Sequence, residues 1–507
     1  MSGPLRLVPD EGTPGWAEET MRLRTIPQRR KRPRLGTAAD TYPELSPDPL
    51  DELADRLADL CADAVHPYEI AAFLESDGLT DEQAALTYGR PDSFTLAEEL
   101  FAKVARRYPG PAPVVTDPWR ADPWRCVLRG LVFALPGLGY LLGADLFATQ
   151  RERFGLPSGM AAMAAATLLS WAWNQALAHR AYGWLSRADR GAAGRALTLG
   201  APLGALVAAS TGWLLGGPLA ALLFTIGQSG YLGAATVLLV LGREKLLLAA
   251  LTPSALGAGL VYLVEVPSLV RWAVLLATLL GAVGLACWEL WRCAHGSEKP
   301  AGDGAEGPAW TGTAAAGLFG LAVGTLTMIA GLGATLHHAV RPAAAPLDGS
   351  NTGPALVALT LSLGLAEWLL YRYRSLATSA LGTTHSPGAF RRRTGLVLAA
   401  CLLGYLAAVT ALDLASTLIW AHAHLIGAAQ LAALLLLAAA LWTALLMQAL
   451  GVAWRTAGLC LAAAGFESVA ILAGGDPLRV QLYGCGAAAV LLVPTAFFVL
   501  GRTTRHR

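Results

Sequence analysis

Charged residues and cysteines are the two kinds of side chain that this sequence has in short supply. Asp, Glu, Lys and Arg make up 15% of 507 residues, against 54% hydrophobic residues, a composition too apolar for an ordinary water-soluble protein. The seven cysteines are scattered and form no Cys-x-x-Cys pair, so we expect neither a disulfide framework nor a metal site. No nucleotide-binding glycine loop, His-Glu-x-x-His motif or nucleophile elbow occurs. We therefore expect a protein that is not an enzyme and holds no cofactor.

The hydrophobic residues are gathered in long stretches from about residue 126 onward. A helix rises about 1.5 Å per residue and needs roughly 20 apolar residues to cross a bilayer. We predict twelve such spans, at 126–148, 158–182, 195–216, 218–241, 246–265, 269–291, 309–336, 353–374, 394–415, 424–449, 454–473 and 480–500. The sequence therefore predicts an all-α, polytopic membrane protein.

Lysines and arginines alternate between the connections that join these spans. With the N-terminus in the cytoplasm, the even-numbered connections and the C-terminal tail hold seventeen of them, and the odd-numbered connections hold five. Cytoplasmic loops carry such an excess. We therefore expect cytoplasmic termini and a location in the inner or plasma membrane of the cell, and the Ala, Gly, Leu and Arg bias is typical of a high-GC bacterial genome.

Two segments of opposite charge precede the first span. Residues 1–45 carry a basic run without hydrophobic periodicity, which predicts a disordered tail. Residues 46–110 predict a small cytoplasmic helical module, with a first helix over 48–65 and a capping box formed by Thr80 and Gln83.

The module is strongly acidic, with fourteen Asp and Glu against three Lys and Arg in residues 46–104. This charge excludes nucleic acid as a partner, because nucleic-acid-binding domains need basic surfaces. We expect either a docking surface for a cytoplasmic protein or a passive cap.

The remaining boundaries follow from composition. A Pro- and Trp-rich linker, 111–125, leads into the membrane region, and the hydrophilic connection 294–308 divides that region into lobe 1 (126–293) and lobe 2 (309–500), with a basic tail at 501–507. Six spans in each lobe, with both ends of each lobe in the cytoplasm, imply that the lobes have the same orientation, as in a parallel repeat.

Weak sequence similarities between the lobes agree with a repeat. The first and seventh spans are both rich in glycine. The second and eighth spans each carry a polar residue five positions before an arginine, among aromatic residues: Gln175 and Arg180 in the second, Glu367 and Arg372 in the eighth.

With these features, and with the segments Trp173–Arg180 and Val240–Leu247, the chain resembles the MATE/polysaccharide flippase (MOP) superfamily. The resemblance covers about residues 125–500. It implies two six-helix lobes that expose a cavity between them alternately to the two sides of the membrane, moving an amphipathic or lipid-linked substrate.

Ionisable groups within spans are costly and mark candidate functional positions. Glu367 and Glu467 lie deep within their predicted spans, where they could bind a proton or a cationic substrate group. Alternatively, Glu367 could pair with the Arg372 region or a tryptophan, and Glu467 could hydrogen-bond a neighbouring helix. Gln175 is a candidate cavity residue, although bonds between helices explain such side chains more simply. Arg180 and Arg372 complete the candidate substrate or proton site, and Arg180 could receive a phosphate group.

These observations favour a secondary transporter or flippase for a lipid-linked or amphipathic cell-envelope precursor, with membrane lipid as its surroundings. A first alternative is a scaffold that recruits envelope or division proteins through residues 46–110 and transports nothing. A second is a major-facilitator-type transporter, although the loop from Gly183 to Arg195 departs from that family's usual pattern. A membrane glycosyltransferase, with Asp145 and Glu152 as its acids, is the least favoured.

Overall fold

The computed structural model describes residues 48–105, 107, 123–143, 156, 159–296, 307–342, 352–419 and 427–505. Within it the chain forms two compact units, one of residues 9–117 and one of residues 118–507 together with 1–8. The predicted tail 1–45 and the acids Asp145 and Glu152 lie outside the described residues, as do most of the linker 111–125 and the middle of the connection 294–308.

The first unit contains five short helices where the sequence predicts a helical module. They are α1 (Pro49–Arg56), α2 (Ala58–Asp63), α3 (Pro67–Ser76), α4 (Asp81–Tyr88) and α5 (Ser93–Lys103). The prediction of one helix over 48–65 is wrong, because the helix is interrupted at Leu57. Cys61 is fully buried in the core of the module, whereas Leu57 is only half-buried.

Side chains at the helix ends stabilise this module. The capping box is confirmed: the Gln83 amide donates to Thr80 Oγ1, and the Thr80 amide donates to Gln83 Oε1, both at 3.3 Å. Asp92 caps α5 by accepting the Thr95 amide at 2.7 Å. This hydrogen bond lowers the pKa of the Asp92 carboxyl, since it favours the ionised form.

The second unit is a bundle of long helices. Lobe 1 consists of α6 (Pro123–Ala134), α7 (Gly137–Leu142), α8 (Met160–Leu185), α9 (Arg190–Leu215), α10 (Leu219–Val240), α11 (Glu244–Leu263) and α12 (Ser268–Gly296). Lobe 2 consists of α13 (Trp310–Val340), α14 (Thr352–Thr383), α15 (Pro387–Ile419), α16 (Ala428–Ala449), α17 (Ala453–Leu472) and α18 (Pro477–Leu500), and the short 3-10 turn η3 (Thr503–Arg505) follows.

Eleven described stretches are long and apolar enough to cross a membrane, with α6 and α7 together forming the first. These match eleven of the about twelve predicted spans, and the remaining predicted span corresponds to α8. The helix α8 has the length, at 26 residues, but it is not among the eleven, and it carries Asn174, Gln175, His179 and Arg180. The unit is thus an all-helical, multi-pass membrane domain.

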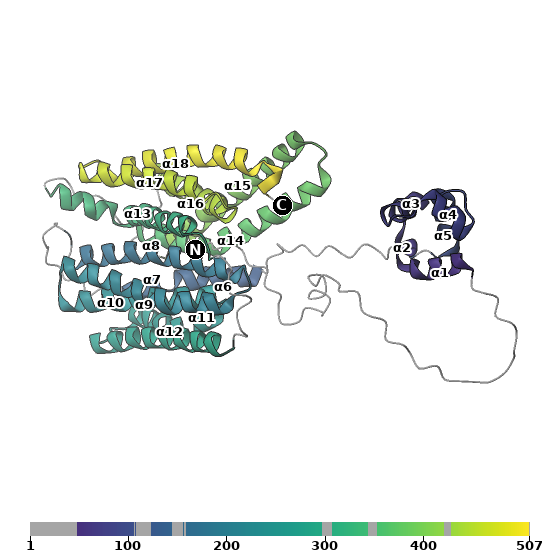
Figure 1. Ribbon diagram of the computed structural model, residues 1–507. Helices are drawn as coiled ribbons and strands as arrows, with labels where there is room; N and C mark the ends of the chain where they lie inside the picture. Colours follow the sequence, from purple (N-terminus) through teal and green to yellow (C-terminus); the bar gives the residue numbers. More distant parts are fainter. Residues whose placement is uncertain are drawn as a thin grey trace. The chain divides into compact units, whose positions relative to one another are not determined.

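The helices of this unit run back and forth between two sides (Figure 1). We call the side on which α6 begins side 1, and the opposite one side 2. The end of α8 and the start of α13 meet on side 1, where a Cβ added to Gly183 would lie 2.8 Å from Cγ of Pro308. The end of α13 meets the α17–α18 turn on side 2, where His337 Nδ1 lies 3.0 Å from the Gly475 carbonyl oxygen.

The lobes contact each other mainly through two helix pairs, α6 with α14 and α8 with α13. In the predicted order of spans, the first of these pairs joins spans one and eight, and the second joins spans seven and two. A two-fold axis along the membrane normal, which relates span one to seven and span two to eight, would therefore exchange the two pairs. The closest positions also correspond. Gly130 of α6 lies against Gly364 of α14, three residues before Glu367. In the other pair, Gly317 of α13 lies against Ala172 of α8, three residues before Gln175. The contacts agree with the parallel repeat, which stays a prediction.

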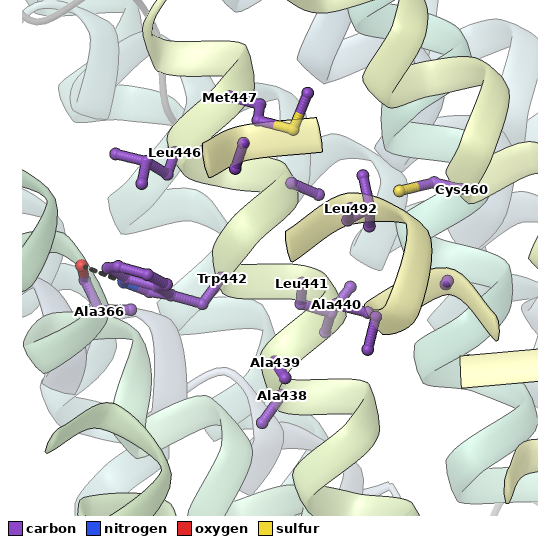
Figure 2. Packing of buried hydrophobic residues seen from close by; sticks show 14 of the residues in the cluster. Ala366, Ala438, Ala439, Ala440, Leu441, Trp442, Leu446, Met447, Cys460 and Leu492 are labelled. Atoms are coloured by element: carbon purple, nitrogen blue, oxygen red, sulfur yellow. Dashed lines mark hydrogen bonds between the residues drawn. The ribbon is translucent and has the colours of Figure 1, made fainter. Parts of the chain in front are cut away.

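Lobe 2 is organised around α16, and its largest buried side chain is Trp442 (Figure 2). The indole Nε1 of Trp442 donates to the Ala366 carbonyl oxygen of α14 at 3.2 Å. Its ring stacks with Tyr405, whose hydroxyl lies 2.9 Å from Ser362 Oγ. A buried indole needs such a partner. Trp442 therefore fixes α14 immediately before Glu367.

The capping box gives a test of the module as an independent domain. We expect a fragment of residues 46–110 to unfold cooperatively in urea, and Thr80→Ala to lower its free energy of unfolding by about 1 kcal/mol, because one helix-end amide loses its acceptor. Thr87→Ala, at an exposed position inside α4, is the matched control and should cause no loss. Equal losses in the two variants would contradict the role of the box.

Candidate functional site

A cluster of charges joins the two lobes on side 1. Arg129, on α6, donates from Nη2 and Nε to Glu244 Oε1 of α11, at 2.6 and 2.9 Å. Its Nη1 donates to Glu367 Oε1 of α14, in the other lobe. The three side chains are 19, 6 and 16% exposed, respectively. Two carboxylates on one guanidinium offset much of the cost of removing these charges from water.

The same cluster is connected to the rest of lobe 1 through the start of α11. Arg243 Nε donates to Glu289 of α12 at 3.0 Å, and Arg292 also reaches Glu289. The next residue, Glu244, instead binds Arg129. The residue before α11 therefore holds α12, and the first residue of α11 holds α6. Positive and negative charges alternate from α12 to α14.

Glycines allow α6 and α14 to touch beside the ion pair. A Cβ at Gly364 would lie 2.4 Å from the Cys126 carbonyl oxygen, and one at Gly130 would lie 3.2 Å from the Gly364 Cα. Since any side chain at Gly364 would meet backbone, the helices approach as small residues allow in membrane bundles. The approach brings Glu367, one turn further along α14, within reach of Arg129.

The structure replaces the predicted partner of Glu367. It records no ion pair between Glu367 and Arg372, and Arg372 is exposed. Glu367 lies sixteen residues, or about 24 Å, before the end of α14. Its partner Arg129 lies six residues, or about 9 Å, after the start of α6. The end of α14 therefore extends beyond α6 on side 1 (Figure 1), and Glu367 lies nearer that side than its distance from the helix start indicates.

Gln175 and Arg180 lie at the other helix pair, α8 with α13. The aliphatic part of Gln175 packs on Gly320, where an added Cβ would lie 2.7 Å from Gln175 Cγ. The guanidinium carbon of Arg180 lies 3.9 Å from the ring centroid of Trp310, at the start of α13. The structure thus places Glu367, Gln175 and Arg180 between the lobes, in two separate helix pairs rather than in one site.

Glu467, on α17, is the second predicted acid, and it is fully buried within lobe 2. Its Oε1 accepts from Cys485 Sγ of α18 at 3.1 Å, and its Oε2 has no hydrogen-bond partner. Gly484 leaves room for it, because a Cβ there would lie 2.4 Å from Glu467 Oε1. No described cation forms a salt bridge with this carboxyl group. An ionised carboxylate in such a place is costly unless a proton or small cation joins it.

Arg129 and Glu244 were not among the site residues predicted from the sequence. One signal was present, since an arginine three residues inside the predicted span 126–148 is costly unless it is paired. The identity of its partners was not accessible, because they lie 115 and 238 residues away in the sequence.

These features define a multi-pass membrane protein of two helical lobes with a charged contact between them. No protein-family model and no curated protein matches the sequence. Solved structures that resemble the chain include an outward-facing multidrug resistance MATE family transporter of the MOP superfamily, at 14% identity, with a TM-score of 0.45, covering 75% of this chain and 97% of that one. A MATE structure in complex with MaD3S is 14% identical, with a TM-score of 0.43, and the match covers 75% of this chain and 96% of that one.

The glycine contact can be tested with one methyl group. We expect Gly364→Ala to lower the Tm of the purified full-length protein by several degrees, since its Cβ must push the Cys126 backbone away, and overpacking costs about 1–3 kcal/mol. Gly404→Ala is the matched control, because no atom lies within 4 Å of the added Cβ. An unchanged Tm for Gly364→Ala would show that α6 and α14 separate freely.

Proposed function

We propose that this protein is a secondary transporter whose two lobes rock against each other, and that Arg129 and Glu367 hold them together on side 1. The observation that carries the proposal is the double pairing of Arg129 with Glu244 of its own lobe and Glu367 of the other. An ion pair between separate lobes exists only while they are together. It is therefore suited to a contact that closes and opens.

Glu244 makes opening less costly in this mechanism. When α14 leaves, Arg129 keeps its two hydrogen bonds to Glu244, so the guanidinium is not left unpaired. Only Glu367 loses its partner, and it lies near side 1, where water or a cationic group can reach it. Breaking the inter-lobe bond therefore costs less than leaving a buried arginine alone.

The cargo that we propose is an amphipathic or lipid-linked precursor of the cell envelope. Support comes from exposed arginines on the side that we take as cytoplasmic, including Arg187, Arg190 and Arg391–Arg393, since guanidinium groups bind phosphate well. The excess of basic residues in alternate connections supports this orientation, with both termini in the cytoplasm.

We further propose that Glu467 takes up a proton or a small cation during the cycle, because its Oε2 is buried without a hydrogen-bond partner. This site is inside lobe 2, separate from the ion pair between the lobes. Binding there would change the packing of α17 on α18 through Cys485, the hydrogen-bond partner of the carboxyl group within the described helices.

A scaffold function has one observation in its favour. The module exposes Tyr68 and Phe94, whose rings meet edge to face at 5.7 Å, and exposed aromatic residues are common at protein interfaces. A cytoplasmic protein that binds residues 46–110 is compatible with transport. Full transport activity of a chain without residues 46–110 would separate the two functions.

Closure by the ion pair is tested at Cys126, which is buried one turn before Arg129. In full-length protein with Cys126 as its only cysteine, we expect Glu367→Gln and Arg129→Gln to increase the rate of maleimide labelling about tenfold, the effect of ~1.4 kcal/mol lost from the closed state. Glu289→Gln, which breaks ion pairs within lobe 1 only, is the control.

Labelling that stays slow in both variants would contradict closure by this pair. Labelling that rises equally in the Glu289→Gln control would indicate general loosening. In a deletion background, Glu367→Gln should also abolish a transport-dependent phenotype, whereas a scaffold would keep it.

The role of Glu467 predicts a second result with the same reporter. In proteoliposomes of the protein with Cys126 as its only cysteine, where Ser at position 485 keeps a donor to the carboxyl group, an imposed proton or sodium gradient should change the labelling rate of Cys126. The added Glu467→Gln substitution should leave the rate unchanged, because the neutral amide takes up no proton and offers a small cation no negative charge. Responses of equal size in the parent and Glu467→Gln would exclude Glu467 as the coupling site.

A further inference from the structure

The two helix pairs that join the lobes differ in how their arginines are neutralised. At α6 and α14, Arg129 has two carboxylates. At α8 and α13, Arg180 has no ion pair or hydrogen bond with any described residue, and its Nη1 is buried without a partner. Its one recorded partner is the ring of Trp310. Within the described part of the chain, the second pair therefore has no anion to correspond to the two carboxylates of the first pair.

Trp310 holds the guanidinium in place without replacing that anion. At 3.9 Å, the ring stabilises the positive charge through its π electrons, but it accepts no hydrogen bond in the plane of the guanidinium. Because Arg180 is stacked, its remaining donors stay in a fixed orientation. A planar fork of this kind suits the oxygens of a phosphate group.

The surroundings indicate a ligand that comes from the membrane. Trp310 is 70% exposed at the surface of the seam between the lobes, and tryptophan beside arginine at the end of a span is typical of the lipid headgroup region. Gly183 and Pro308 pack closely at the same level. A lipid bound here would contact α8 of lobe 1 and α13 of lobe 2 together.

We propose that Arg180 and Trp310 form a binding site for the phosphate of a phosphate-headed lipid, which supplies the missing counter-charge and joins the lobes on side 1. The shared chemistry is a phosphate group on an acyl or prenyl chain. Two sources fit it, an anionic phospholipid of the bilayer and a lipid-linked cargo. The site does not depend on transport, so it would also exist in a scaffold.

The test is lipid binding to the purified, delipidated full-length protein in a neutral detergent. Dioleoyl phosphatidylglycerol, undecaprenyl phosphate and inorganic phosphate are titrated separately, with bound lipid counted by native mass spectrometry and Tm followed in parallel. We expect at least one lipid to bind and raise the Tm, and inorganic phosphate to do neither. Arg180→Gln should weaken lipid binding about tenfold, as expected for a lost charge-assisted hydrogen bond, and Trp310→Leu should weaken it less.

Arg502→Gln, which removes an exposed arginine just after α18, is the matched control and should bind as the parent does. Binding of phosphatidylglycerol identifies a bilayer lipid, and binding of undecaprenyl phosphate alone identifies cargo-like chemistry. Equal lipid affinity in Arg180→Gln and the parent would overturn the proposal. A full rise in Tm with inorganic phosphate would also overturn it. So would an equal loss of Tm in Arg180→Gln with and without lipid, since an acid of the chain would then be the counter-charge.

Discussion

The charge of Arg129 is the constraint on which the contact between the lobes depends. A guanidinium removed from water at the start of a membrane span must find negative charge, and here one carboxylate comes from each lobe. The pair with Glu244 keeps the arginine neutralised within lobe 1. The pair with Glu367 adds a bond that only the assembled lobes can make, so one side chain connects the stability of a lobe to its position against the other.

Packing within each lobe positions these charges. Trp442 bonds to α14 at Ala366, so the core of lobe 2 sets the position of the following residue, Glu367. In lobe 1, the start of α11 holds α12 through Arg243 and α6 through Glu244. The charged contact therefore rests on two rigid supports, as a preorganised site requires.

The sequence predicted the helices well, because the length of a hydrophobic stretch and the charges beside it report directly on membrane crossing. It predicted the helix ends in the module for a similar reason, since Thr80 and Gln83 interact within one turn. It did not predict which helices meet. The partner of Glu367 is on a helix 238 residues away, and a nearby arginine, Arg372, was the simpler candidate. The span 158–182 was predicted from its length, but α8 is less apolar than the other eleven helices because it carries Asn174, Gln175, His179 and Arg180.

The meeting of Gly130 and Gly364 has a consequence for the speed of motion. Backbone touches backbone at this point, so few side-chain torsions are frozen when the helices come together, and few are released when they part. Side-chain ordering at a contact ordinarily consumes up to about 2 kcal/mol per long residue. At these two positions, forming or breaking the contact therefore changes the entropy of almost no side chain.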